Sequence, residues 1–215
     1  MQPPANVPHA ADAPGPAPVT LAGTGDDSIT RLLASAGDGH AEAWHRIYDL
    51  LYDDLHRIAR SQIRRRSGSG LSPTSLVSET WLKLAGAELD VSGRRHLTSL
   101  IARAMRFVLL DEARRMLAEK RQAGAGITAL DEDIADPGSQ DRLEQLLALD
   151  QALDGLAQVD ERLAQVVELR YFGGLTEEEV AGTLDLNVRT IRRDWRRARA
   201  YLLDRLGEGG RDIAI

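Results

Sequence analysis

Residues 175–202, LTEEEVAGTLDLNVRTIRRDWRRARAYL, decide the fold of the C-terminal part of this chain. Thr176 and Glu179 have the spacing of a capping box, in which each side chain accepts from a free backbone N–H at a helix start. Asp185 follows the first short helix at a position that suits a left-handed backbone, which aspartate tolerates better than most residues. Asn187 is a favoured N-cap for a second helix. The stretch therefore predicts two short helices joined by a tight turn, a helix-turn-helix.

The second helix of this motif has two chemically different faces. One face is apolar and consists of Val188, Ile191, Trp195, Ala198 and Leu202. The remaining positions are mostly basic and comprise Arg189, Thr190, Arg192, Arg193, Arg196, Arg197 and Arg199. Arginine binds phosphate and forms hydrogen bonds with guanine in the DNA major groove, which is wide enough for an α-helix. We expect this helix to bind DNA; a solvated basic helix packed in a bundle is the competing interpretation.

The rest of the chain predicts an all-α protein with two small helical domains, the C-terminal one a helix-turn-helix. Apolar residues recur at spacings of three and four, and no run alternates apolar with polar residues. A Ser-Pro pair at Ser72 and Pro73 predicts a helix start. The expected boundaries are a disordered tail at 1–27, an N-terminal domain at 28–122, a flexible acidic linker at 123–143, a C-terminal domain at 144–206 and a tail at 207–215. The first tail is rich in Pro, Ala and Gly, and the linker collects Gly, Pro and Asp.

The composition limits the classes of function. The chain has 215 residues, of which 43% are hydrophobic, with no cysteine and a formal net charge of −6. The lack of cysteine excludes disulfides and thiolate metal sites and favours a cytoplasmic location. No apolar run approaches the roughly 20 residues that cross a membrane, so no membrane partner is expected. A protein with a negative net charge is expected to bind DNA only weakly without sequence specificity. Arginines and acids are segregated along this chain, however, so local charge is more informative than net charge.

A second basic segment covers residues 94–121, RRHLTSLIARAMRFVLLDEARRMLAEKR. Its apolar positions are expected to be buried and are Leu97, Leu100, Ile101, Ala104, Val108, Leu109 and Met116. Its basic positions are available for phosphates and are Arg103, Arg106, Arg114, Arg115, Lys120 and Arg121. By itself a charged helix face is usually only solvated, so this segment indicates DNA binding only together with the motif above.

Three segments, in this order and spacing, resemble the extracytoplasmic-function (ECF) group of bacterial sigma factors over roughly residues 28–206. They are LSPTSLVSETWLKL at 71–84, ARAMRFVLLDEARR at 102–115 and RTIRRDWRRARAYL at 189–202. The resemblance implies a protein that binds core RNA polymerase and directs promoter recognition, DNA melting and transcription initiation. It implies two partners, core RNA polymerase and promoter DNA. It implies no catalytic residue and no cofactor, because the polymerase performs the chemistry.

The resemblance assigns roles to individual residues. Core-polymerase binding falls to Glu79, Thr80 and Trp81, although Ser75 and Ser78 replace the Asp and Gln of many members. Ordinary core packing is the competing interpretation of Trp81. The minus-ten promoter element is assigned to Arg103, Arg106, Arg114, Arg115, Lys120 and Arg121. The minus-thirty-five element is assigned to Arg189, Thr190, Arg192, Arg193 and Arg196.

Two features of the resemblance leave alternatives open. A base released by melting is often held on an aromatic ring, but Leu97 and Thr98 stand where the related subgroup usually has aromatics after the histidine. Phe107 is the only aromatic ring besides His96 in this segment, and it either serves this role or belongs to the core. In the family the linker passes through the RNA channel of the polymerase. Its acids either imitate RNA phosphates or form a self-repelling tether, and they are Asp131, Glu132, Asp133, Asp136 and Asp141.

Other classes of function fit the sequence less well. A conventional helix-turn-helix regulator that acts without core polymerase usually dimerises, and this chain has no heptad seam for a dimer helix. An enzyme is not expected, because no H-E-x-x-H spacing, P-loop, dinucleotide fingerprint or G-x-S-x-G elbow occurs. No metal is expected either. An interaction module such as an adaptor would leave the arginine face unexplained. An anti-sigma factor or another regulator is a further candidate partner.

Overall fold

The computed structural model describes residues 26–37, 41–65, 70–85, 91, 93–125 and 138–207. These residues form helices and connections, and no strand occurs among them, which confirms the predicted all-α class. The elements in chain order are α1 (Asp26–Gly37), α2 (Ala41–Arg65), α3 (Pro73–Ala85), α4 (Arg94–Ala125), α5 (Gly138–Val159), α6 (Glu161–Val167), the π-helix η2 (Glu168–Phe172), α7 (Glu177–Leu184) and α8 (Val188–Leu206). No helix in these ranges is both long and apolar enough to cross a membrane.

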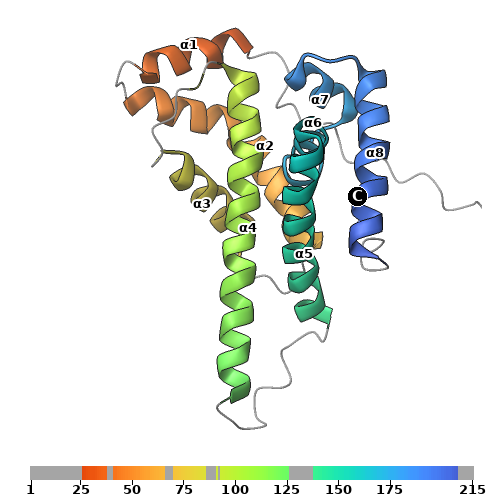
Figure 1. The fold of residues 1–215 in the computed structure, drawn as a ribbon. Helices are drawn as coiled ribbons and strands as arrows, with labels where there is room; N and C mark the ends of the chain where they lie inside the picture. The colour runs from red at the N-terminus through yellow and green to blue at the C-terminus, as the bar shows by residue number, and fades with distance from the viewer. Residues whose placement is uncertain are drawn as a thin grey trace, which may run out of the picture.

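Helix α4 is the central element of the molecule (Figure 1). Helices α1 and α3 lie on one side of it and α5 to α8 on the other, while α2 passes behind it. Helices α3 and α5 both pack directly against α4. The N-terminal half, α1 to α4, therefore contacts the C-terminal half, α5 to α8, along much of the length of α4.

The ends of several helices follow from local chemistry. Helix α3 begins at Pro73, as the Ser-Pro pair predicts, and the backbone N–H of Ser75 donates to Oγ of Ser72 at 3.0 Å. Helix α5 begins at Gly138, inside the predicted linker at 123–143. The first turn of α5, GSQD, is polar and carries no helical periodicity until Leu143, which is buried, so the sequence pattern does not mark the start of this helix.

Part of the predicted tails and linker lies outside the described residues, namely 1–25, 126–137 and 208–215. Four of the five acids singled out in the linker fall there, and they are Asp131, Glu132, Asp133 and Asp136. The fifth, Asp141, is exposed in the first turn of α5, where its negative charge interacts favourably with the helix dipole and stabilises the helix. The two hypotheses about the linker acids therefore stay untested.

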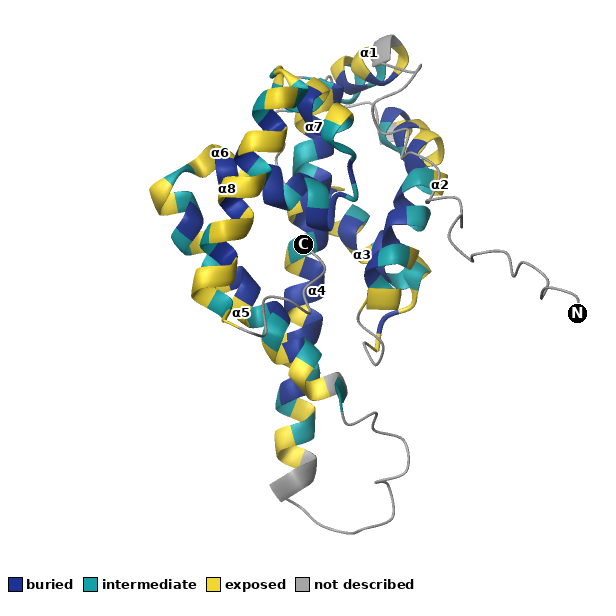
Figure 2. Ribbon diagram, turned by 90° about the vertical axis from the view of Figure 1, so that its right-hand side faces the viewer, coloured by how far each residue is buried: buried dark blue, intermediate teal, exposed yellow. Residues whose placement is uncertain are grey.

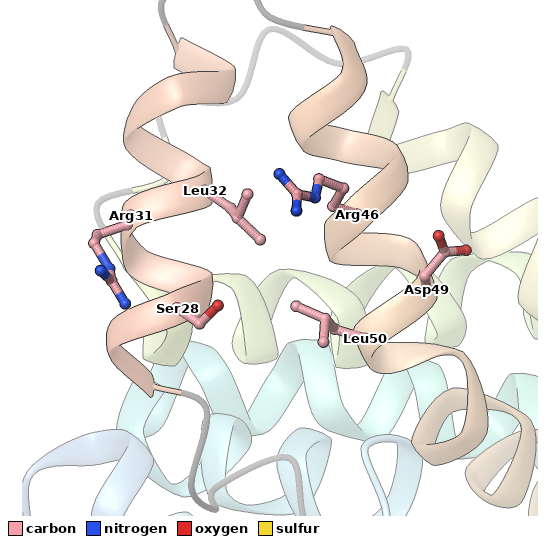
Figure 3. Close-up of a pocket in the computed structure, with 6 residues that line it drawn as sticks. All are labelled: Ser28, Arg31, Leu32, Arg46, Asp49 and Leu50. Carbon is pink, nitrogen blue, oxygen red and sulfur yellow. The ribbon is translucent and has the colours of Figure 1, made fainter.

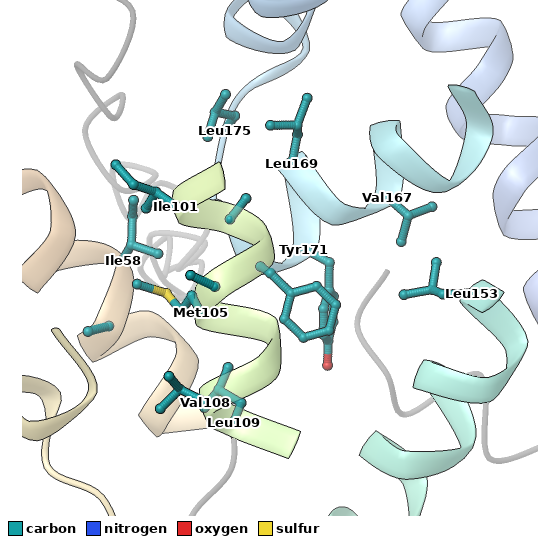
Figure 4. Close-up of a cluster of buried hydrophobic side chains, with 14 of the residues drawn as sticks. Ile58, Ile101, Met105, Val108, Leu109, Leu153, Val167, Leu169, Tyr171 and Leu175 are labelled. Carbon is teal, nitrogen blue, oxygen red and sulfur yellow. The ribbon is translucent and has the colours of Figure 1, made fainter. Parts of the chain in front are cut away.

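The two halves share one continuous hydrophobic core. From α4, Met105 and Val108 lie on the side of the helix toward Ile58 of α2, and Tyr171 and Leu153 of the other half lie on its opposite side, all in the same cluster (Figure 4). In Figure 2, the buried residues of α4 and α5 are concentrated where these helices face their neighbours, and the lower end of α4 is largely exposed. In this conformation the predicted domains are packed together, while the division at residues 123–143 stays a prediction.

A π-helix and two glycines, which the sequence pattern does not reveal, take part in the contact between the halves. The N–H of Gly173 donates to the carbonyl of Glu168 at 3.0 Å, which closes the wide π turn. Gly174 has a φ of 65°, a region that glycine enters without steric cost. From α2, the buried amide of Gln62 donates to the carbonyl of Phe172 at 3.1 Å and also to that of Tyr171. The two halves are thus joined by polar as well as apolar contacts.

We expect Gly173→Ala to destabilise the protein. A Cβ at this position would lie 2.6 Å from the carbonyl oxygen of Leu169 and 3.1 Å from Cβ of Ala102 on α4, so the backbone would have to shift. Such overpacking costs roughly 1–3 kcal/mol. Gly182→Ala is the matched control, because its Cβ would meet nothing within 4 Å and alanine favours a helix. Denaturant unfolding of both variants checks this, and equal stability of the two would contradict it.

Candidate nucleic-acid interface

The capping interactions predicted for α7 and α8 are present. The N–H of Glu179 donates to Oγ1 of Thr176 at 3.2 Å, and the N–H of Thr176 donates to the carboxylate of Glu179 at 2.7 Å. Asp185 ends α7 with φ 55° and ψ 46°, in the left-handed region. The side chain of Asn187 accepts from the N–H of Arg189 at 2.8 Å and starts α8. These local interactions fix the turn between the two helices and hence the direction of α8.

Helix α8 exposes its arginines and buries the opposite face. Ile191, Ala198 and Leu202 are buried, as predicted. Trp195 is half-buried, and the guanidinium of Arg170 lies 4.2 Å from its ring centroid. Thr190 is half-buried, and the exposed members of the predicted set are Arg189, Arg192, Arg193 and Arg196. The structure therefore brings the predicted minus-thirty-five arginines together on one solvent-accessible helix.

Acidic residues at the start of α7 hold one of these arginines. Nε of Arg192 donates to Glu177 at 2.7 Å and Nη2 to Glu178 at 3.3 Å, which raises the pKa of Arg192 above its ordinary value. Glu177 also pairs with Arg170 at 3.2 Å, while burial lowers the pKa of Arg170. This ion network links α8 to α7, and phosphate would compete with Glu177 and Glu178 for Arg192.

Asp194 is the residue of α8 that sequence reasoning missed. Its side chain is fully buried on the inner face, where the helical pattern predicts an apolar residue. Nε of Arg162 on α6 donates to Oδ2 of Asp194 at 2.9 Å, and Nε of Arg193 lies 3.5 Å from Oδ1. A buried carboxylate needs such partners to offset its desolvation. The pair attaches α8 to α6, and its only sequence signal is an aspartate in an arginine-rich helix.

The predicted minus-ten residues lie along α4, most of them at its surface. Arg103, Arg114, Arg115 and Arg121 are exposed and Lys120 is half-buried. Neighbouring acids of the same helix engage Arg115, which pairs with Glu112 at 2.7 Å and with Glu119 at 2.6 Å. The exposed arginines are spread along α4 from Arg103 to Arg121, with the exposed acids Asp111 and Glu119 among them.

Arg106 differs from the other minus-ten residues because it faces the C-terminal half. Its side chain is only 12% exposed, and its Nε donates to Oδ1 of Asp150 on α5 at 2.8 Å. Its Nη2 donates to Asp154 at 2.8 Å, and its Nη1 lies 3.4 Å from Glu168 on η2. Arg114 adds a contact of 3.4 Å to the second oxygen of Asp150. We call these five residues the Arg106 cluster.

Burial and charge have opposite effects within the Arg106 cluster. Burial alone would lower the pKa of Arg106, but its hydrogen bonds to Asp150 and Asp154 outweigh that effect and the pKa is raised. Burial raises the pKa of Glu168, and the positive charge of Arg106 opposes the rise. The charge of Arg103 also opposes the rise, whereas that of Asp150 adds to it.

The three residues predicted to bind core polymerase are in different environments. Glu79 is exposed. Thr80 is 1% exposed and its hydroxyl donates to the carbonyl of Leu76 at 2.7 Å, so in this conformation it supports α3 and does not reach a partner. Trp81 is half-buried and its ring packs 5.0 Å from that of Tyr48, centroid to centroid. Leu82, which the sequence pattern did not single out, is 69% exposed beside Glu79 and Trp81.

These sets form extended surfaces and do not converge on a pocket. A groove of about 490 Å³ between α1 and α2 contains none of the predicted site residues (Figure 3). Its lining consists of Ser28, Arg31, Leu32, Arg46, Asp49 and Leu50. Within the described ranges, no group of His, Asp or Glu side chains could hold a metal ion. Extended basic helices suit a polyanion better than a small substrate.

The fold and these surfaces define an all-helical protein with basic helices exposed in both halves. A comparison with curated proteins gives no match. A family model described as "ECF sigma factor" matches residues 26–208. Because the match spans most of the chain, the chain belongs to the ECF sigma factor family. It is therefore a sigma factor that works with core RNA polymerase in the initiation and regulation of transcription.

Proposed function

We propose that this protein recognises a promoter through two helices and melts it while bound to core RNA polymerase. Helix α8 would lie in the major groove of the minus-thirty-five element and read base edges with Arg189, Arg193 and neighbouring arginines. Helix α4 would bind the minus-ten element through its exposed arginines. Phosphate contacts would set the register of both helices, and base contacts would set the sequence preference.

The observation that carries this proposal is the arginine face of α8 on a helix whose direction is fixed by three local caps. Thr176 and Glu179 cap α7, and Asn187 caps α8. An arginine-rich face that is solvent-accessible and rigidly positioned suits recognition of DNA, since contact geometry must be reproduced at every base pair.

DNA melting is supported by an aromatic ring at the surface of α4. Phe107 is 38% exposed, and cations flank it: Lys83 on α3 lies 6.0 Å from its ring centroid and Arg103 lies 5.8 Å from it. Single-stranded nucleic acid binds to aromatic rings beside basic groups, because bases stack and phosphates pair with cations. We propose Phe107 as a stacking surface for unpaired promoter DNA.

Binding of core polymerase is the first test. The labelled protein should bind purified bacterial core polymerase saturably in a fluorescence-anisotropy titration. We expect Leu82→Asp on α3 to weaken this binding roughly tenfold or more, because it places a charge in an exposed apolar contact. Leu50→Asp is the matched control, since Leu50 is also largely exposed but lies on α2.

The outcome also separates the proposal from its main alternative. Absence of saturable polymerase binding, together with sequence-specific binding of the free protein to duplex DNA, would identify a conventional helix-turn-helix regulator. Equal weakening by Leu82→Asp and Leu50→Asp would remove α3 from the proposed polymerase surface.

A further inference from the structure

The Arg106 cluster connects the two halves of the molecule through side chains that we assign to DNA binding. Asp150 contacts both Arg106 and Arg114, so one carboxylate of the C-terminal half engages two of the proposed minus-ten cations. Carboxylate and phosphate oxygens are bound by a guanidinium in the same way, with short charge-assisted hydrogen bonds. In this conformation the acids of α5 and η2 occupy the place on Arg106 that a DNA phosphate would need.

Other contacts reinforce the same arrangement. Gln62 of α2 donates to the backbone of η2, and Ile58 of α2 lies against Gly174, where an added Cβ would be 3.4 Å away. Exposed Arg95 at the start of α4 lies 3.4 Å from Asp185 in the turn between α7 and α8. The turn that directs α8 is therefore held against the N-terminal half. Two DNA-binding helices in such contact are not free to reach two separate promoter elements.

We propose that Arg106 is the latch of a closed, autoinhibited state, in which Asp150, Asp154 and Glu168 imitate DNA phosphates. The inference rests on the proposed function. Separation of the halves releases Arg106 and Arg114 to bind DNA, and anything that binds the open form shifts the population toward it. Core polymerase and promoter DNA each favour opening, so each strengthens the binding of the other. The apolar contacts and the ion cluster both stabilise the closed form, and the ion cluster also makes closure compete directly with DNA.

The latch is tested by measuring the distance between the halves without polymerase or DNA. The chain has no cysteine, so Arg60→Cys on α2 and Ala200→Cys on α8, both exposed positions, can carry a pair of fluorophores for energy transfer. In this background the double variant Asp150→Asn/Asp154→Asn removes two latch charges with little change in shape. We expect the ratio of open to closed molecules to rise roughly tenfold, since each charge-assisted hydrogen bond contributes substantially.

A charge-matched control distinguishes the latch from a general effect of charge. Asp53→Asn/Asp54→Asn also removes two negative charges, but Asp54 pairs with Arg57 within α2. Lower energy transfer in the latch variant and unchanged transfer in the control supports the proposal. Unchanged transfer in both variants, or an equal decrease in both, overturns it. Asp154→Asn alone, at a side chain 72% exposed, provides a variant that retains the buried Asp150 and should show a smaller opening.

A second measurement uses duplex DNA that contains the cognate promoter. The latch variant, without polymerase, should bind this DNA more tightly than the parent protein. Its affinity should also fall more steeply with salt, by about 0.9 in the logarithmic slope for each additional phosphate that the protein neutralises. An unchanged slope despite opening would contradict the assignment of Arg106 and Arg114 to DNA. Failure of the polymerase titration would instead count against the proposed function, because the energy-transfer result does not depend on polymerase.

Discussion

Phe172→Ala is expected to lower the free energy of unfolding by about 3–5 kcal/mol, the range for removal of a buried phenylalanine side chain. Phe172 is fully buried at the end of η2, and its ring packs edge-on against that of Tyr171 at 4.9 Å between centroids. Its carbonyl accepts from Gln62 of α2, which places Phe172 where the halves meet. Removal of the phenylalanine ring would therefore leave a cavity between the halves. Denaturant unfolding followed by circular dichroism measures the effect.

The chain supplies its own control for this prediction. Phe107→Ala removes the same side chain from α4, but Phe107 is exposed enough that we expect a cost of about 1 kcal/mol or less. A difference between the two variants is therefore due to burial and not to the chemistry of the substitution. Similar costs for Phe107→Ala and Phe172→Ala would mean that η2 is not packed between the halves as the structure has it.

Arg189→Ala or Arg193→Ala is expected to reduce transcription from the cognate promoter strongly. If either arginine makes a bidentate contact with guanine, its loss costs about 1–3 kcal/mol of discrimination, roughly 5-fold to 150-fold in promoter preference. Both are exposed and lie in the first half of α8, the part of a recognition helix that contacts bases. The measurement is in vitro transcription with holoenzyme on the cognate promoter and on one with an altered minus-thirty-five element.

Arg205→Ala serves as the control, because Arg205 is exposed in the last turn of α8 and its guanidinium lies over Tyr201, 5.3 Å from the ring centroid. It removes an arginine from the same helix outside the proposed contact. A loss of overall affinity without a change in promoter preference would assign Arg189 and Arg193 to phosphates. Full activity of variants at Arg189, Arg192, Arg193 and Arg196 would contradict the assignment of α8 to DNA.

Local features of the fold were predictable because they depend on neighbours in the chain. The capping box at Thr176, the left-handed Asp185 and the Asn187 cap involve residues no more than three positions apart, so their chemistry is visible in the sequence. The apolar face of α8 was also predictable, since helical periodicity determines which side chains point the same way. The exposed arginines of α8 follow from the same pattern.

Other features depend on contacts between distant residues. Asp194 is buried because Arg162, 32 positions earlier, is brought beside it when α6 packs on α8. Thr80 matched a family motif yet is enclosed by its surroundings. The π-helix at Glu168–Phe172 is contacted by Gln62, 110 positions away from Phe172 in sequence, and no local pattern marks it. Periodicity identifies a buried face but does not identify the partner that covers it.

The all-helical class, the caps around α7 and α8 and the arginine-rich face of α8 are properties of the amino-acid sequence alone. The packing of α4 against α5 and η2, and hence the pairing of Arg106 with Asp150, Asp154 and Glu168, arises only in the folded molecule. The reason is physical. Helix formation and capping are satisfied within a few residues, whereas a charged side chain takes its role from whichever opposite charges the packing places beside it.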